Sequence, residues 1–325
     1  MDAYEFGDNM SIKIRDKIIQ KGEKAKGYVK VAEASTHDVN MPYIVVNGAL
    51  EGPKLCVLGG VHPLEYAGTE GVLKVGNEID PSKMRGILFL LPIVNTDGFH
   101  AKAAFINPID FVNQNRVYPG DPKGTMSRRV ADVVFTEFVS KSEYLIDSHG
   151  GDSTEDINKY VIIGNTKDKK LRSTMIDMAS CYDSHYIQTT NIVGSSGEAM
   201  TKYGIPCITP ETGTPYPVRE EEVNWHFEGI INVMKLLGMI EGKPKLKKQL
   251  VDPKIEKVVS EHGGLWIQKV EVGSRVKKGV LLGEVVSLVG DTMQKVEAPC
   301  DGVVSTTRTS ATVNTGDVLA QIARI

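Results

Sequence analysis

The chain has 325 residues, of which 41% are hydrophobic and 24% are charged, and its formal net charge at pH 7 is -3. This composition is typical of a globular protein, and the weak charge gives no reason to expect nucleic acid or an anionic membrane as a partner. No apolar run reaches the roughly 18 residues of a membrane-spanning helix, and Met1–Lys30 lacks an apolar signal core. We therefore expect a cytoplasmic protein, and the length favours two domains.

Short apolar runs alternate with helical patterns over residues 1–240. In chain order we predict strand Lys54–Gly59, helix Glu65–Glu78, strand Gly86–Val94, helix Ser127–Lys141, strands Tyr144–Asp147 and Lys159–Ile163, helices Asp168–Tyr182 and Ser196–Tyr203, strand Pro206–Thr209 and helix Arg219–Leu237. Continuous apolar strands that alternate with helices predict an α/β catalytic domain, 1–240, with a mostly parallel sheet and helices on both faces.

The composition then changes twice. Residues 241–254 are charged, contain two prolines and are interpreted as a linker. Residues 255–325 contain short Val-rich strands, frequent Gly and no convincing helix. A weak internal repeat relates Glu271–Val285 to Ser310–Ile322, and the two copies flank Ala298–Val304.

This C-terminal pattern resembles the biotinyl/lipoyl-type β-sandwich. Carrier versions of that fold present a lysine for modification, but the matching position here is Asp291, and Lys295 is out of register. We therefore predict a structural β-sandwich domain without a carrier lysine, which shapes the mouth of the active site.

Candidate metal ligands begin at the end of the first predicted strand. His62 and Glu65 follow Gly59–Gly60, and their spacing at a strand-to-helix turn can bring an imidazole and a carboxylate to one metal ion. A catalytic zinc site has three nitrogen, oxygen or sulfur ligands and one open position for water. Considered alone, a histidine and a glutamate at this spacing more often lie on a solvent-exposed helix face.

A third candidate ligand, His149, follows the predicted strand Tyr144–Asp147. Asp147 lies on the same strand face, where its carboxylate can accept a hydrogen bond from the imidazole and fix its tautomer. The two glycines after His149 let the backbone approach a ligand closely. The alternative is that His149 caps a loop and Asp147 caps the next turn.

Glu211 is the candidate catalytic residue. A carboxylate beside a metal-bound water can take its proton and later pass it to a leaving amine; otherwise Glu211 is an ordinary loop glutamate. Asn115 and Arg116 are the candidate substrate-binding residues, because a guanidinium matches a carboxylate in two parallel hydrogen bonds. For an isolated arginine, a surface salt bridge is the commoner role.

Several of these candidate residues share one location in the predicted sheet. Ligands of an open α/β sheet bind outside the carboxyl ends of its strands. Four of the polar residues considered fall at such ends in the predicted sheet: His62, Asn95, His149 and Glu211.

Four motifs occur in the order Gly59–Glu65 (GGVHPLE), Asn113–Gly120 (NQNRVYPG), Asp147–Gly150 (DSHG) and Glu211–Gly213 (ETG). Together they resemble the succinylglutamate desuccinylase/aspartoacylase family, and the layout is similar to the branch with N-acetyl-diaminobutyrate deacetylases. The resemblance covers most of the chain. It implies a zinc carboxypeptidase-like fold with a mixed, mostly parallel sheet and a small C-terminal β domain. It also implies one zinc ion and hydrolysis of an N-acyl amino acid.

Three positions depart from the family pattern. Pro63 replaces a glycine and stiffens the turn after His62, and Asn113 replaces an acidic residue, which removes a charge near Arg116. Phe105 stands where the family commonly has an arginine thought to polarise the scissile carbonyl. Another hydrogen-bond donor must then help the zinc to polarise this carbonyl, and the candidates are Lys102, Arg128 and Arg129.

We therefore predict a zinc-dependent amidohydrolase that removes the acyl group from an N-acyl amino acid by metal-activated water. Its partner is that small molecule, with no nucleic acid and no membrane, and assembly into a homo-oligomer stays open. One alternative is a metallocarboxypeptidase acting on small peptides, which needs an open groove. The other is a non-catalytic metal-binding homologue; Phe105 favours it, whereas the presence of all three ligands and Glu211 argues against it.

Overall fold

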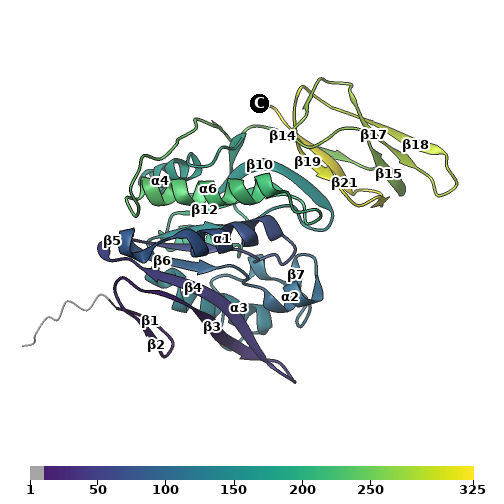
Figure 1. The fold of residues 1–325 in the computed structure, drawn as a ribbon. Coiled ribbons are helices and arrows are strands. Elements are labelled where there is room, and N and C mark those ends of the chain that lie inside the picture. The colour runs from purple at the N-terminus through teal and green to yellow at the C-terminus, as the bar shows by residue number, and fades with distance from the viewer. Residues whose placement is uncertain (1–10) are drawn as a thin grey trace, which may run out of the picture.

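The computed structural model describes residues 11–325, and its main feature is a large mixed sheet with helices on both faces (Figure 1). From one edge to the other, the strands are β14 (Ile255–Val259), β21 (Val318–Ala323), β19 (Gly302–Arg308), β10 (Glu155–Gly164), β12 (Cys207–Gly213), β9 (Tyr144–Asp147), β5 (Leu50–Leu58), β6 (Arg85–Leu91), β4 (Asp38–Asn47) and β3 (Lys24–Glu33). Three further strands pair beside this row, namely β11 (Tyr186–Thr190), β13 (Leu250–Val251) and β16 (Arg275–Val276).

The helices form two layers. One face of the sheet shares a buried apolar cluster with α1 (Tyr66–Glu78), α4 (Lys169–Ala179) and α6 (Glu220–Leu236). The other face shares a second cluster with α3 (Met126–Glu137) and α5 (Ser196–Lys202). The remaining short elements are α2 (Thr96–Ala101), η1 (Pro81–Lys83), η2 (Gln114–Arg116), η3 (Val139–Lys141), the pair β1 (Ile12–Ile14) and β2 (Lys17–Ile19), and the pair β7 (Ile106–Asn107) and β8 (Val112–Asn113).

The sheet is mixed, as predicted, but it is parallel only in part. Strands β6, β5, β9 and β12 run parallel at the centre, so their carboxyl ends meet at one edge. The outer pairs β3–β4 and β19–β21 are antiparallel. A short loop can join antiparallel strands, whereas a parallel pair needs a long crossover, usually a helix. Within residues 11–325, the segments that carry β3–β4 and β19–β21 have no such helices between the paired strands, and these strands therefore extend the sheet in the antiparallel sense.

The C-terminal segment also forms a separate antiparallel sheet from β15 (Gly264–Gln268), β17 (Leu281–Val286), β18 (Thr292–Glu297) and β20 (Thr312–Val313). This segment has its own apolar cluster, which includes Trp266 and Leu282. It lies beyond one end of β10 in Figure 1. The likeness to a biotinyl/lipoyl-type sandwich and the division at residues 241–254 remain predictions.

The C-terminal segment is joined to the rest of the chain by strand pairing. Glu155–Ile157 of β10 pair with Thr306–Arg308 of β19, so the large sheet continues from one part into the other. The predicted linker is mostly irregular but packed, since the backbone N of Lys247 donates to the carbonyl of Ser180 at 2.8 Å.

Two simpler predictions can be compared with this fold. All four cysteines are buried and free, as the lack of paired spacing indicates. Among residues 11–325, no helix is long and apolar enough to cross a membrane.

Candidate functional site

A tight turn after β5 places the first two candidate ligands. Gly60 has a φ of +59°, which favours glycine, and a Cβ on Gly59 would lie 2.9 Å from the carbonyl oxygen of Pro92. The chain then reaches His62 and ends the turn at Glu65, the N-cap residue of α1. The Glu65 side chain makes no cap hydrogen bond. Its carboxylate is thus free to face the histidines.

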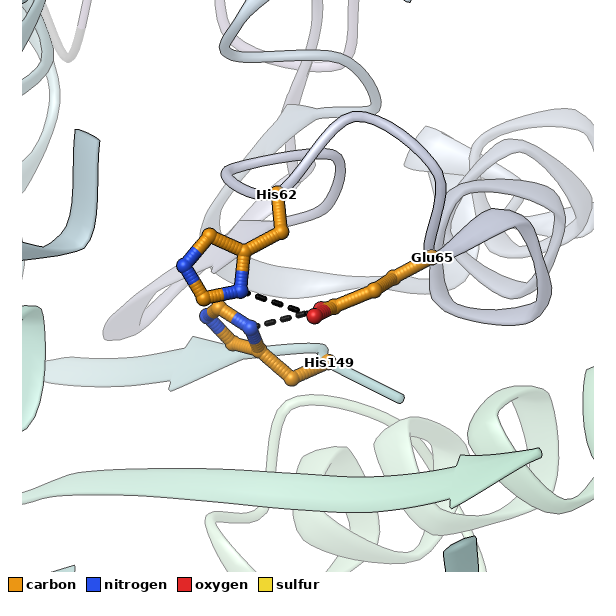
Figure 2. A group of neighbouring side chains, drawn as sticks. All are labelled: His62, Glu65 and His149. Atoms are coloured by element: carbon orange, nitrogen blue, oxygen red, sulfur yellow. Dashed lines mark hydrogen bonds and ion pairs between the residues drawn. The ribbon is translucent and has the colours of Figure 1, made fainter. Parts of the chain in front are cut away.

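The three predicted ligands lie together at the carboxyl edge of the parallel strands. The Nδ1 atoms of His62 and His149 each lie 2.7 Å from a carboxylate oxygen of Glu65 (Figure 2). One donor atom from each residue can be chosen so that all three lie within 4.8 Å of one another. A tetrahedral zinc ion with ligands at about 2.1 Å needs donor atoms about 3.4 Å apart. Small side-chain adjustments therefore bring this set onto one ion.

The outer nitrogen of each imidazole also has an acceptor. Nε2 of His149 lies 3.0 Å from the carboxylate of Asp147, the role predicted for this residue. Nε2 of His62 lies 3.1 Å from Oδ1 of Asn113. In the neutral imidazoles that a metal ion binds, protons on both Nε2 atoms would leave both Nδ1 atoms as lone-pair donors towards the space beside Glu65. The contact between Asn113 and His62 was not predicted, because it joins residues 51 positions apart that no local pattern relates.

The ionisable groups of the cluster shift each other's pKa values towards their charged forms. Burial alone would raise the pKa of Glu65, but the two imidazoles lower it to about 2. Burial lowers the pKa of His149, whereas the carboxylates of Asp147 and Glu65 outweigh this and raise it well above its usual value. The cluster thus holds a carboxylate that is ionised near neutral pH, which is the form that binds a cation.

Glu211 lies directly beside this group. It forms an isolated parallel bridge with His149, and the backbone N of His149 donates to the carbonyl of Pro210 at 2.9 Å. Burial raises the pKa of Glu211 well above its usual value, although the charge of His149 opposes the rise. A carboxyl group with a raised pKa is suited to taking and giving a proton near neutral pH.

A cavity of about 190 Å³ opens at this place and brings all six predicted site residues together. They are His62, Glu65, Asn115, Arg116, His149 and Glu211. The Arg116 side chain is exposed, its Nη1 donates to the carbonyl of Asn115 at 2.7 Å, and it forms no ion pair with any residue of the described part of the chain. Asn115 is buried, and its Oδ1 accepts from the backbone N of Ser196 at 2.9 Å.

Phe105, the residue at the expected position of the family arginine, lies beside the candidate metal centre. Its ring lies edge-on to His62 with the centroids 5.3 Å apart, and it lines the cavity. The candidate replacements for the missing arginine do not line this cavity, although all lie within the described residues: Lys102, Arg128 and Arg129. Asn95 does not line it either, because its side chain caps α2 and accepts from the backbone N of Gly98 at 3.0 Å.

One wall of the cavity was not anticipated. Five residues of β10 line it: Glu155, Ile157, Tyr160, Ile162 and Gly164. Side chains of a strand alternate between its faces, so odd and even positions should point apart. The pairing with β12 shifts between Ile157 and Tyr160, and this bulge turns both halves of the strand towards the same cavity.

Fold and site together define a mixed α/β protein with a candidate His-Glu-His metal centre at the carboxyl edge of its parallel strands. Residues 51–237 match the model of the succinylglutamate desuccinylase/aspartoacylase catalytic domain. The chain belongs to this family.

Similar proteins agree with this assignment. The chain is 27% identical over 304 residues to the N-alpha-acetyl-L-2,4-diaminobutyric acid deacetylase of Halomonas elongata, covering 90% of this chain and 88% of the relative. The fold matches the product-bound ectoine utilization protein EutE (DoeB) from Ruegeria pomeroyi, with a TM-score of 0.85, 23% identity and coverage of 93% and 95%. It also matches a succinylglutamate desuccinylase from Silicibacter sp. TM1040, with a TM-score of 0.83, 23% identity and coverage of 98% and 99%.

Proposed function

We propose that the protein is a zinc-dependent amidohydrolase that removes the acyl group from an N-acyl amino acid. The observation that carries the proposal is the arrangement of both histidine Nδ1 atoms around Glu65, with Glu211 beside them in one cavity. Two imidazole nitrogens and a carboxylate oxygen are ligands that zinc accepts, and three protein ligands leave one position open. Family membership and the deacetylase relative support the choice of an amide substrate.

The residues then have distinct tasks. His62, Glu65 and His149 hold the metal, which when bound supplies a Lewis acid that lowers the pKa of water towards roughly 7. Glu211 takes a proton from the attacking water and later gives it to the nitrogen of the departing amine. Arg116, with Asn115, holds the substrate carboxylate through its guanidinium. Asp147 and Asn113 keep the two imidazoles in the tautomer that leaves Nδ1 free.

The size of the cavity favours a small substrate. A volume of about 190 Å³ suits an amino acid with a short acyl group better than a peptide that continues in both directions. The substrate, the metal and the roles of the site residues are parts of the proposal.

The test is release of free amine by the zinc-loaded protein from a panel of N-acetyl, N-succinyl and longer N-acyl amino acids, with dipeptides alongside. We expect cleavage of an N-acyl amino acid that a chelator abolishes. Cleavage of dipeptides alone would favour a metallocarboxypeptidase. No cleavage by a metal-replete protein would favour a non-catalytic homologue and point to Phe105 as the cause.

The role of Glu211 gives a second prediction. Glu211→Gln keeps the shape of the side chain but removes the group that exchanges a proton with water. General acid–base catalysis contributes roughly 10²- to 10⁴-fold, so kcat should fall by that factor while the zinc content stays at one ion per chain. Both are measured on the same preparation. Full activity in this variant would exclude the assigned role.

A further inference from the structure

Ser196 contacts two residues of the candidate site and has no task in the proposed mechanism. It is the first residue of α5, and it is buried. Its Oγ donates to Oδ2 of Asp147, and its backbone N donates to Oδ1 of Asn115 at 2.9 Å. One residue of α5 therefore holds both the carboxylate behind a proposed metal ligand and a part of the proposed substrate anchor.

The carboxylate of Asp147 has few hydrogen-bond donors besides this hydroxyl. Asp147 is fully buried, and its Oδ2 lies 3.0 Å from Nε2 of His149. Its Oδ1 has no hydrogen-bond partner within residues 11–325. Ser196 and His149 therefore meet at the same oxygen of this carboxylate. A buried carboxylate with so few partners is stabilised strongly by each donor that it keeps.

The hydroxyl of Ser196 is not needed to begin the helix. The N-cap residue of α5 is Ser195, whose Oγ accepts from the backbone N of Glu198 at 3.2 Å. Inside a helix, serine has a lower intrinsic propensity than alanine. The contact with Asp147 therefore explains the side chain of Ser196 better than the formation of α5 does.

The backbone of Ser196 fixes the place where this contact is made. Its N–H is one of the donors that the start of a helix leaves without an intrahelical partner, and Oδ1 of Asn115 accepts from it. The same hydrogen bond orients the amide of Asn115, whose Nδ2 lies 3.4 Å from Nε2 of His149. Asp147 and Asn115 thus both lie beside the outer nitrogen of His149, and Ser196 holds them both.

We propose that Ser196 is a positioning residue, which holds the carboxylate of Asp147 against His149 and so fixes this imidazole in the orientation that binds the metal. The inference rests on the proposed function and adds a residue to its metal centre. Ser196 does not line the cavity, and it acts through Asp147.

The test measures zinc affinity by competition with a chelating dye, in the absence of substrate. Ser196→Ala removes the hydroxyl and keeps the backbone N that donates to Asn115. Loss of a group that orients a metal ligand typically weakens metal binding by about 10- to 100-fold, and we expect roughly 10-fold here because Asp147 itself stays. Ser196→Thr keeps a hydroxyl and should bind zinc more tightly than Ser196→Ala.

Ser195→Ala is the matched control. It removes the same atom from the neighbouring residue and destabilises α5 through loss of its cap, but within residues 11–325 no hydrogen bond joins Ser195 to Asp147. The thermal midpoint of the metal-free protein should fall in this variant, while its zinc affinity should equal that of the wild type. Equal weakening of zinc binding in Ser195→Ala and Ser196→Ala would overturn the inference, because both would then act through the stability of α5.

A double substitution tests whether the effect passes through Asp147. If Ser196 acts by holding this carboxylate, Ser196→Ala should change the zinc affinity little in a protein that already carries Asp147→Ala. Additive losses of affinity would overturn the inference, and so would equal affinities of Ser196→Ala and the wild type.

Zinc binding without turnover separates the inference from the proposed function. If the wild type binds zinc but cleaves no N-acyl amino acid, the proposed reaction has failed, and the affinities of the Ser196 variants still decide the role of this residue. A wild type that binds no zinc would overturn both.

Discussion

The Nε2 atoms of the two candidate histidine ligands contact different acceptor groups. Asp147 gives His149 a charged acceptor, whereas Asn113 gives His62 a neutral one. A carboxylate raises the basicity of the imidazole that it contacts more than an amide does. His149 should therefore be the stronger of the two nitrogen ligands.

Replacement of Asp147 tests this arrangement. Asp147→Asn keeps an acceptor oxygen but removes the charge, and loss of such an outer partner typically weakens metal binding by about 10- to 100-fold. We expect this change in zinc affinity, measured by competition with a chelating dye. Asn113→Ala is the comparison and should have the smaller effect. Equal affinities of Asp147→Asn and the wild type would contradict the role of the carboxylate.

We expect His226 to make the free energy of unfolding depend on pH. It is fully buried on α6, where a Cβ on Gly71 of α1 would lie 2.6 Å from its own Cβ, and burial lowers its pKa to about 3. The unfolded chain titrates near 6.5, so below this pH it binds a proton that the folded chain does not. The free energy of unfolding should therefore fall as the pH drops from about 6.5 towards 3.

The measurement is denaturant unfolding of the metal-free protein at pH 7 and pH 5. At about 1.4 kcal/mol per pH unit, the His226 contribution between these conditions is about 2 kcal/mol. His226→Leu removes the titrating group and should lose this part of the acid sensitivity. The same pH dependence in the variant and the wild type would show that His226 is not the cause.

At the scale of elements, one loop controls the position of Arg116. Gly194 has a φ of +75°, and a Cβ there would lie 2.1 Å from the carbonyl oxygen of Arg116. The backbone N of Tyr118 also donates to the carbonyl of Gly194 at 3.0 Å. The loop before α5 is therefore fitted closely against the segment that carries the proposed substrate anchor.

Gly194→Ala should displace Arg116 and raise KM several-fold, with a smaller change in kcat. Gly204→Ala is a suitable control, because Gly204 has a similar φ of +73° but nothing lies within 4 Å of its Cβ position. Both variants carry the backbone cost of a positive φ, of order 1–3 kcal/mol. A KM that rises equally in both would attribute the effect to stability and not to Arg116.

Helices were predictable because their apolar residues recur with the helical period, and central strands because they are short continuous apolar runs. The prediction Glu65–Glu78 differs from α1 by one residue, and Tyr144–Asp147 coincides with β9. Strands β3 and β4 were missed. The polar and lysine-rich sequence of β3 lies at the sheet edge, and β4 contains Pro42, so neither shows the continuous apolar run used to find the others.

The site was predictable where its residues lie at or near the carboxyl ends of strands and not where it depends on strand pairing; Glu211 itself lies within β12, two residues before its end. His62, His149 and Glu211 lie in or beside motifs that can be read along the chain. The contact of Asn113 with His62 joins residues 51 positions apart, and the shared face of β10 depends on a bulge against β12. A local pattern does not contain that information.

At the scale of the molecule, a bound metal would connect separate parts of the fold. His62 and Glu65 come from the loop between β5 and α1, and His149 from the end of β9. Zinc that binds only the folded chain stabilises it by about 2.7 kcal/mol at a free concentration 100 times its Kd. The thermal midpoint should rise on zinc addition by a few degrees, measured by calorimetry.

His149→Ala provides the control for this effect. It removes one proposed ligand, so its midpoint should respond far less to zinc. Magnesium, which prefers oxygen ligands, should have little effect on either protein. A rise of the same size in His149→Ala would place the zinc elsewhere on the molecule.

The pairing of β10 with β19 also has a consequence for biosynthesis. A ribosome completes Glu155 long before it reaches Arg308, so the nascent chain holds every proposed catalytic group while one edge of β10 is still open. Exposed strand edges invite pairing with other chains. A product of early translation termination would therefore be a substrate for chaperones and proteases, and not a shorter working enzyme.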